Sequence, residues 1–309
     1  MAILQTYDMN GKKLSFANWI SNLSPTETPF VSMTGKEAVT QTKFNWQVDT
    51  LAKPKFHAIV EGSDVVDADA SMNQTKVLTN YTQILRRVVK VTDTANLIAT
   101  YGRGRETAYQ LEKAGLALKR DLEAILLQRG QAASSVKGAA RKTASFGALV
   151  AAKDTAHEDT GAVVHFESKG TVVGDITSAD IQEMTYQLCL ANSKADIIMF
   201  HPKFAKVFAG LQEAEGHKKL FDGDEETFSH YVNTYIDQFG KEYKLVPNRF
   251  MPKDAVYFFR ASDFTQMVLR APQRIKLAKE GAFETWMIEM EIGLRLDNPF
   301  AAGVLLAKA

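Results

Sequence analysis

The chain has 309 residues, of which 45% are hydrophobic and 24% are charged, and its formal net charge is +1 at pH 7. This composition is that of a globular protein with one large domain or two modest ones, and the balanced charge excludes a general polyanion-binding character. The single cysteine, Cys189, excludes an intrachain disulfide and any zinc site with two cysteines from one chain. The N-terminus lacks a secretory pattern, and no apolar run approaches the roughly 20 residues that span a bilayer, so we expect a soluble protein made inside the cell.

Residues 1–44 are expected to form an arm rather than the start of a compact domain. Their apolar side chains are scattered without a helical or strand period, and Pro25 and Pro29 disfavour helix in the residues before them. An arm with apolar anchors usually lies on another surface, either on the same subunit or on a neighbour.

Residues 42–91 have the pattern of an extended β-hairpin. In residues 42–49, Phe44, Trp46 and Val48 alternate with polar residues, which predicts a strand with one buried face. Residues 50–80 are too polar to form a core, and residues 83–91 read as the second strand. Loops this long are uncommon in compact domains and are usually functional, so we expect contact with another subunit.

Residues 102–130 carry the longest uninterrupted helical signal. The apolar positions share one face and the charged positions lie roughly opposite: Leu111, Leu118, Leu122 and Ile125 against Glu112, Lys119, Arg120 and Glu123. A helix over about 105–129 would be roughly 37 Å long, with Gly130 as a left-handed terminator. This helix is either the spine of the subunit or a long core helix of an ordinary enzyme domain.

Residues 131–145 are small, polar and basic, and are predicted to form a mobile connector. A weaker alternative is that Lys137, Arg141 and Lys142 touch phosphate. Residues 146–176 carry short β signals with glycines at the turns.

The remaining chain predicts an α/β domain with a central sheet. Thr177 and Asp180 form a capping signal for a helix that buries Ile181, Met184 and Leu188. Further elements are expected in this order: a buried strand at 196–200, a helix at 203–211, a surface loop at 212–232, strands at 243–246, 255–259 and 265–269, a long strand at 284–296 and a short final strand. The long strand, roughly 43 Å, matches the long helix and is expected to pack along it.

No catalytic, cofactor-binding or metal site is predicted. Gly102 and Gly104 precede a helix, but the third glycine of a dinucleotide fingerprint and a Walker lysine are missing. The six histidines, at 57, 157, 165, 201, 217 and 230, are dispersed without a helical metal spacing, although a site of one histidine and carboxylates assembled in space stays open. Cys189 is interpreted as a buried, inert thiol. Glu289 and Glu291 lie two apart on one strand, so paired-carboxylate chemistry is geometrically possible, but an exposed polar face is the simpler interpretation.

The order of elements, and several local blocks, resemble one family. The order is similar to the Hong Kong 97-like fold of tailed-phage major capsid proteins, which encapsulin compartments share. The blocks that look like those of a podophage-type major capsid family are SPTETPF at 24–30, FNWQVDTL at 44–51, EG at 61–62 and NYTQILRRVVKVTDTANLIATYGRGRETAYQLEKAGLALKRDLEAILL at 80–127. The resemblance covers about the first 130 residues well and identifies a scaffold rather than a reaction.

The resemblance implies an α+β fold with the following parts: an N-terminal arm at 1–44, an extended loop at 45–92, a peripheral domain at 93–145 and 271–298 that holds the spine helix and the long strand, and an axial domain at 146–270 and 299–309. It implies pentamers and hexamers of an icosahedral shell around double-stranded DNA, without cofactors, enzymatic activity or a membrane. The implied partners are a separate scaffolding protein, a portal and a possible decoration protein. The implied place is the virion, after synthesis in the bacterial host cytoplasm. An encapsulin-like compartment and, less readily, a soluble α/β enzyme are the alternatives.

Overall fold

The computed structural model describes residues 27–49, 51, 58–64, 75–98, 104–134, 139–150, 166–167, 176–214 and 234–306. These residues belong to two compact units. The first contains Arg86–Leu118 and Gln273–Glu289, and the second contains Glu27–Leu85, Lys119–Pro272 and Met290–Ala309. Several predictions lie outside the described residues: the arm at 1–26, most of the loop at 50–80, Gly102, Lys137, residues 215–232 of the surface loop predicted at 212–232, and five of the six histidines. The first residues of that predicted loop, 212–214, belong to a helix instead.

The long helix predicted from periodicity is confirmed as α3, Glu106–Leu127. Leu111, Leu118 and Leu122 are buried, as the spacing predicts. Glu123, which the same spacing placed on the charged face, has no exposed surface. The predicted left-handed conformation of Gly130 is wrong, because the positive φ angles among the described glycines belong to Gly62 and Gly240.

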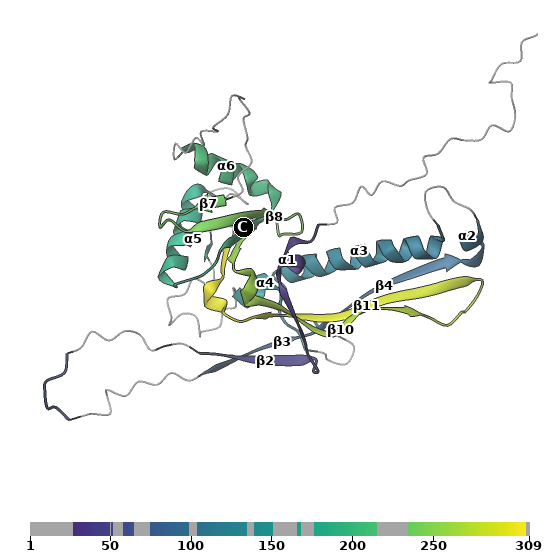
Figure 1. Ribbon diagram of the computed structural model, residues 1–309, viewed down its shortest axis with the longest axis horizontal. Coiled ribbons are helices and arrows are strands. Elements are labelled where there is room, and N and C mark those ends of the chain that lie inside the picture. The colour runs from purple at the N-terminus through teal and green to yellow at the C-terminus, as the bar shows by residue number, and fades with distance from the viewer. Residues whose placement is uncertain are drawn as a thin grey trace, which may run out of the picture. The chain divides into compact units, whose positions relative to one another are not determined.

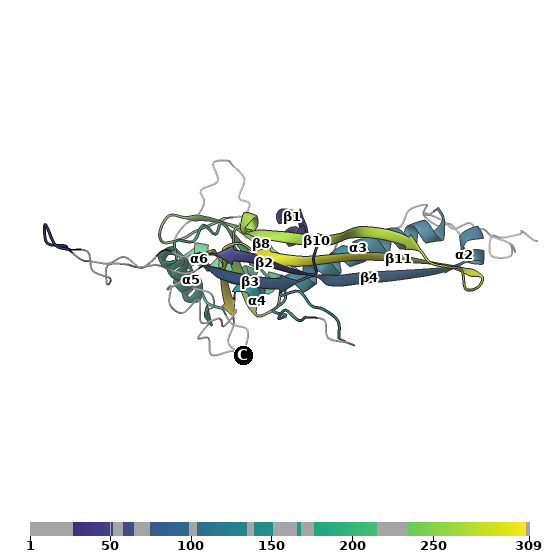
Figure 2. The same cartoon turned by 90° about the horizontal axis from the view of Figure 1, so that it is seen from below.

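A four-stranded sheet has the order β1-β10-β11-β4. Its strands are β1 (Gly35–Ala38), β4 (Gln83–Thr92), β10 (Phe264–Lys276) and β11 (Phe283–Leu296). The long strand predicted at 284–296 is confirmed as β11, although its middle is buried on both faces rather than on alternate residues. β1 runs parallel to β10 with Gly35 opposite Thr265. Within the first unit, α3 runs along β4 and β11 (Figures 1 and 2).

The extended hairpin consists of β2 (Lys43–Val48) and β3 (Lys76–Tyr81), which pair antiparallel as a separate two-stranded sheet. The prediction that residues 83–91 form its returning strand is wrong. That stretch is the strand β4, which pairs with β11 instead. The returning strand is residues 76–81, which were expected to belong to the polar loop. Thr82 separates it from β4, because the N–H of Thr82 donates to the carbonyl of Thr42 and its hydroxyl donates to Glu291 of β11.

A six-stranded mixed sheet has the order β5-β12-β9-β6-β8-β7. Its strands are β5 (Phe166–Glu167), β6 (Ile197–Phe200), β7 (Thr234–Ile236), β8 (Glu242–Pro247), β9 (Ala255–Phe259) and β12 (Gly303–Leu306). The central strands β6, β9 and β12 are buried along their whole length, which explains their continuous apolar runs. The helices α5 (Ser178–Leu190) and α6 (Ala205–Ala214) contribute to a core with this sheet, and the predicted capping box of Thr177 and Asp180 is present.

Short helices complete the described part of the chain: α1 (Pro29–Met33), α2 (Asp93–Leu97), α4 (Phe146–Val150) and 3-10 turns at Pro202–Phe204, Ala261–Asp263 and Pro299–Ala301. α4 begins the range 146–176, in which the sequence predicted short β signals, and most of that range lies outside the described residues. Phe30 of α1 is fully buried and packs edge-to-face on Phe146 of α4, with ring centroids 6.0 Å apart. Residues 27–34, expected in the arm, therefore pack into the second unit, and residues 35–38 form its exposed strand β1.

Candidate assembly surfaces and their polar supports

The base of the hairpin β2–β3 is fixed by a buried amide. The side-chain amide of Asn80 has no exposed surface. Its Nδ2 donates to the carbonyl of Leu294 at 2.6 Å, and its Oδ1 accepts from the backbone N–H of Ala144 at 2.8 Å. Beside it, the N–H of Thr82 donates to the carbonyl of Thr42 at 2.9 Å. These bonds give the hairpin a rigid attachment to β11 and to the residues that precede α4.

Gly293 of β11 lets the hairpin approach that closely. A Cβ atom at this position would lie 2.6 Å from Cε1 of Phe44 and 3.0 Å from the carbonyl oxygen of Tyr81. Phe44 is buried and stacks on Trp46 with ring centroids 6.0 Å apart. The absent side chain of Gly293 thus makes room for an aromatic side chain of the hairpin.

The described residues beyond the hairpin strands are strongly exposed although several are apolar. Ile59 is 65% exposed, Val60 is 78% exposed and Leu51 is 96% exposed. Ile59 and Val60 lie at the start of a turn in which the N–H of Ser63 donates to the carbonyl of Val60, with Gly62 at a φ of 81°. Apolar side chains as exposed as these make a candidate surface for another macromolecule.

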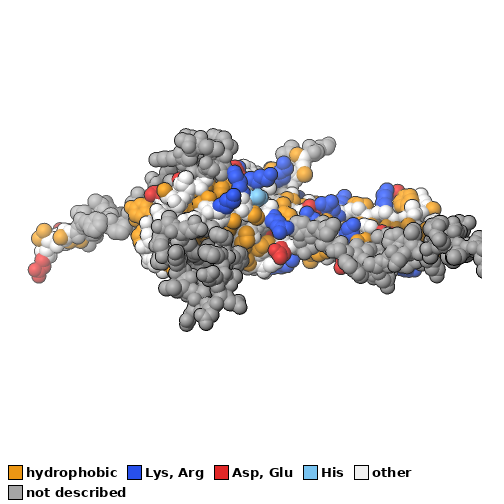
Figure 3. Space-filling model, turned by 90° about the horizontal axis from the view of Figure 1, so that it is seen from above, with side chains coloured by type: hydrophobic (Ala, Val, Ile, Leu, Met, Phe, Trp, Pro, Cys, Tyr) orange, Lys and Arg blue, Asp and Glu red, His pale blue; other side chains and the backbone are white. Residues whose placement is uncertain are grey.

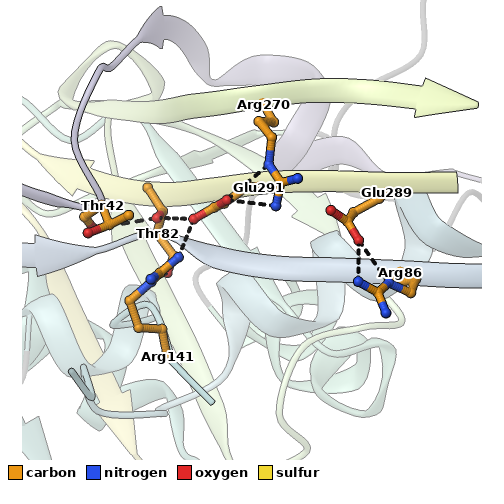
Figure 4. A network of polar contacts seen from close by, with 7 residues as sticks. All are labelled: Thr42, Thr82, Arg86, Arg141, Arg270, Glu289 and Glu291. Carbon is orange, nitrogen blue, oxygen red and sulfur yellow. Dashed lines mark hydrogen bonds and ion pairs between the residues drawn. The ribbon is translucent and has the colours of Figure 1, made fainter. Parts of the chain in front are cut away.

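Glu291 of β11 is a buried carboxylate bound by two arginines (Figure 4). It accepts from the hydroxyl of Thr82 at 2.7 Å and from Nη2 of Arg270 at 3.0 Å, and it forms an ion pair with Arg141. Burial by itself raises the pKa of Glu291, but the hydrogen bonds from Thr82 and Arg270 and the charge of Arg141 together lower it below its ordinary value. The carboxylate is therefore ionised at neutral pH.

This cluster corrects two predictions. Residues 131–145 are not a mobile connector throughout, because Arg141 binds Glu291 and the backbone of Ala133 pairs with that of Lys142. The weaker suggestion that Arg141 touches phosphate is also overturned, since its guanidinium is already bound.

Glu289 lies in the first unit and forms a separate pair with Arg86 of β4 (Figure 4). Nε and Nη2 of Arg86 lie 2.8 Å and 2.6 Å from Oε2 of Glu289, whose side chain is 7% exposed. The interpretation of Glu289 and Glu291 as an exposed polar face is thus wrong. Each carboxylate is neutralised by its own arginine partners, which does not favour paired-carboxylate catalysis.

Glu123 is a third buried carboxylate, and sequence reasoning missed it. Its two oxygens accept from the N–H groups of Phe30 at 2.9 Å and Val31 at 2.8 Å, and Asn248 donates its side-chain amide at 2.6 Å. Burial raises the pKa of Glu123, although these hydrogen bonds and the charge of Lys119 oppose the shift. Glu123 thereby holds α1, where residues 27–33 join the fold, against the second half of α3.

Lysine and arginine side chains gather on the face of the molecule drawn in Figure 3. His201, the one histidine among the described residues, is close enough to Lys203 and Lys253 to be affected by their charges. Partial burial lowers the pKa of His201, and the charges of Lys253 and Lys203 lower it further. His201 is therefore mainly neutral at pH 7, and the positive charge of this surface comes from lysine and arginine. Within the described ranges no group of three histidine, cysteine, aspartate or glutamate residues is placed to hold a metal ion.

Cys189 is exposed, so its interpretation as a buried thiol is wrong. It lies on the outer side of α5, one residue after the buried Leu188. No helix in the described part of the chain is long and apolar enough to cross a bilayer.

Comparison with known proteins gives one consistent result. Residues 3–308 match the family described as SU10 major capsid protein. The chain is 50% identical to the major capsid protein of Escherichia phage Phieco32 over 98% of this chain and 96% of that protein.

Solved structures agree at the level of the fold, which is the Hong Kong 97-like capsid fold. A native GTA particle capsid aligns with a TM-score of 0.64 and 12% identity over 98% of this chain and 97% of that one. A chain from a structure of Mycobacterium phage Bobi aligns with a TM-score of 0.63 and 12% identity over 96% of each chain. The SrpI encapsulin of Synechococcus elongatus PCC 7942 aligns with a TM-score of 0.57 and 12% identity over 96% of this chain and 92% of that one. The chain therefore belongs to the SU10 major capsid protein family, whose members are structural proteins of the virion and not enzymes.

Proposed function

We propose that the chain is the repeating subunit of an icosahedral head, in which pentamers and hexamers close around double-stranded viral DNA. The observation that carries this proposal is the 50% identity to a phage major capsid protein over nearly the whole of both chains. The exposed apolar residues of the extended hairpin support it, because they provide a surface that a neighbouring subunit can cover.

We assign a role in the shell to each part of the subunit that was expected from the sequence. Within the expected arm, 1–44, the part before Glu27 lies beneath or beside a neighbour. Within the expected loop, 45–92, the part up to Tyr81 lies over another neighbour, since residues 83–92 belong to the four-stranded sheet. Residues 93–145 and 271–298 form the peripheral domain, and residues 146–270 and 299–309 form the axial domain around the five-fold and six-fold axes. The burial of Phe30 and Val31 favours an arm whose free part ends before Glu27.

The proposed partners follow from the same function. A scaffolding protein directs assembly, a portal occupies one vertex and a decoration protein is an optional addition. The subunit is made in the cytoplasm of a bacterial host. Contact with DNA is nonspecific and electrostatic, and the lysines around His201 are one candidate surface for it.

An encapsulin-like compartment is the second candidate, supported by the structural likeness to the SrpI encapsulin. A cargo enzyme that copurifies with the shell would favour it. The much higher identity to a phage capsid protein weighs against it.

Negative-stain electron microscopy tests the proposal directly. The protein is expressed alone and together with the scaffolding gene that neighbours it. Closed icosahedral particles are the expected result in at least one of the two preparations. Monomers or small oligomers in both would contradict the proposal.

A further inference from the structure

The outer face of α5 and the turn between β7 and β8 share an exposed apolar patch. We define the α5 patch as Tyr186, Cys189, Leu190 and Phe239. Tyr186 is 41% exposed, Leu190 is 62% exposed and Phe239 is 51% exposed. The three α5 residues have the spacing i, i+3, i+4, so they lie on one face of the helix, opposite the buried Ile181, Met184 and Leu188.

Specific contacts join the two elements of the α5 patch, helix α5 and the turn between β7 and β8. The ring of Tyr186 stacks on the ring of Phe239 with centroids 6.4 Å apart. Nζ of Lys241 donates to the carbonyl of Ser193 at 2.6 Å, which ties the turn to the residues that follow α5.

The turn itself is built so that Phe239 projects into solvent. The buried carboxylate of Asp237 accepts from the N–H groups of Phe239 at 2.9 Å and Lys241 at 2.8 Å. Gly240 supplies a φ of 79°, which other residues adopt with strain. The exposed part of a fixed aromatic side chain contributes no free energy of burial. It contributes that free energy only when another surface covers it.

From this arrangement we infer that the α5 patch is a contact between neighbouring copies of this chain within one capsomer. The inference rests on the proposed function, since a shell of identical subunits makes a second copy the partner present next to every patch. In a closed ring, one surface of each subunit meets a different surface of the next. Aromatic and aliphatic side chains that lie preordered and free of charge are typical of the centre of such an interface.

Cys189 makes the inference testable without any substitution. It is the single cysteine of the chain and lies inside the α5 patch, so the alkylation rate of its thiol reports coverage of the patch. Iodoacetamide is applied to unassembled subunits, to isolated capsomers and to closed shells, and electron microscopy establishes the state of each sample. We expect alkylation to be roughly tenfold slower or more in capsomers and shells than in subunits, because a covered thiol is inert.

Protection in open capsomers excludes slow entry of the reagent into a closed shell as its cause. Capsomers or shells whose Cys189 reacts as fast as in free subunits would overturn the inference and leave the proposed function standing. The absence of capsomers and shells from every preparation would overturn both.

A pair of substitutions provides the second measurement. The double variant Tyr186→Ser with Leu190→Ser changes side chains that are largely exposed, so its circular dichroism should match that of the parent. It should form few capsomers, and its Cys189 should remain reactive. The matched control is Leu116→Ser, at an exposed leucine of α3 outside the patch, in which Cys189 should keep its protection. Normal capsomers with a protected Cys189 in the double variant would overturn the inference.

Discussion

At the scale of single residues, the described interior contains carboxylates that are buried but differ in their electrostatic state. Glu291 has a lowered pKa because two arginines and a hydroxyl outweigh its burial. Glu123 has a raised pKa because no cation is hydrogen-bonded to it in the described structure and burial dominates. The two should therefore make opposite contributions to the dependence of stability on pH.

For Glu291, a lowered folded pKa means that its contribution to stability is present above the ordinary carboxyl pKa and is lost as the pH falls through the folded value. Glu291→Gln should lower the free energy of unfolding by about 1–3 kcal/mol at neutral pH, because an amide cannot satisfy two guanidinium groups. The deficit should shrink in acid. Urea unfolding of the unassembled subunit, followed by tryptophan fluorescence, measures it, and a deficit that grows in acid would contradict the assignment.

The two arginines at Glu291 should not be equivalent. The side chain of Arg141 is 19% exposed, whereas that of Arg270 is 45% exposed. We expect Arg141→Ala to cost about 3 kcal/mol, as for a broken buried pair, and Arg270→Ala to cost about 1 kcal/mol, since water screens the more exposed charge. The same urea unfolding assay measures both losses of unfolding free energy. A larger loss for Arg270→Ala than for Arg141→Ala would contradict the prediction.

For Glu123, a raised folded pKa means that its contribution is present below the ordinary carboxyl pKa and is lost as the pH rises through the folded value. Glu123→Gln should destabilise by about 1–3 kcal/mol, because its amide nitrogen faces a backbone N–H of α1 or the amide of Asn248. The deficit should be larger near about pH 5 than near about pH 8. Unfolding curves at the two pH values test the sign, and a deficit that increases with pH would refute the raised pKa.

At the scale of elements, two glycines allow a matched test of packing. Gly293 lies against Phe44 and the backbone of Tyr81, whereas a Cβ atom at Gly115 of α3 would meet nothing within 4 Å. Gly293→Ala should destabilise the subunit by about 1–3 kcal/mol through forced repacking. Gly115→Ala should stabilise it by about 0.5–1 kcal/mol, because glycine is a poor residue in the middle of a helix. Equal effects of the two substitutions on the urea midpoint would contradict this account.

Periodicity predicted the long helix and the long strand. The spacing of Leu111, Leu118 and Leu122 identified α3 and also its buried face. The alternation at 284–296 identified β11 as a strand, but not its burial, because the middle of β11 is covered on both faces. The pairing of β2 was predicted wrongly, since residues 76–81 and 83–92 are both strand-like and only the hydrogen bonds around Asn80 and Thr82 separate them.

The buried carboxylates could not be predicted from local pattern. The helical spacing placed Glu123 with the exposed Lys119, but α1 and Asn248 cover that side of the last turns of α3. The partners of Glu291 are 21, 150 and 209 positions away along the chain. No local pattern in the sequence indicates which arginines will meet a given glutamate across such distances.

At the scale of the whole molecule, the extended hairpin should be required for assembly and dispensable for folding. Its strands pair with each other in a sheet of their own, so removal of residues 55–78, or Ile59→Ser with Val60→Ser, leaves the two larger sheets intact. Both variants should remain folded by circular dichroism but form no shells by electron microscopy. Glu61→Gln with Asp64→Asn, on the same turn, is the matched control and should assemble. Closed shells from the deletion variant would show that residues 55–78 are not an assembly element.

The parallel pairing of β1 with β10 has a consequence for the time course of synthesis. Gln266 of β10 donates to the carbonyl of Val31, 235 positions earlier in the chain. At translation rates of about 5–20 residues per second, the segment around Val31 waits roughly 10–50 s for this partner. A chain that terminates before β10 never acquires the strand beside which β1 must lie. We therefore expect truncated products to lack the native fold, so that an assembling shell would draw only on subunits whose translation has passed β10.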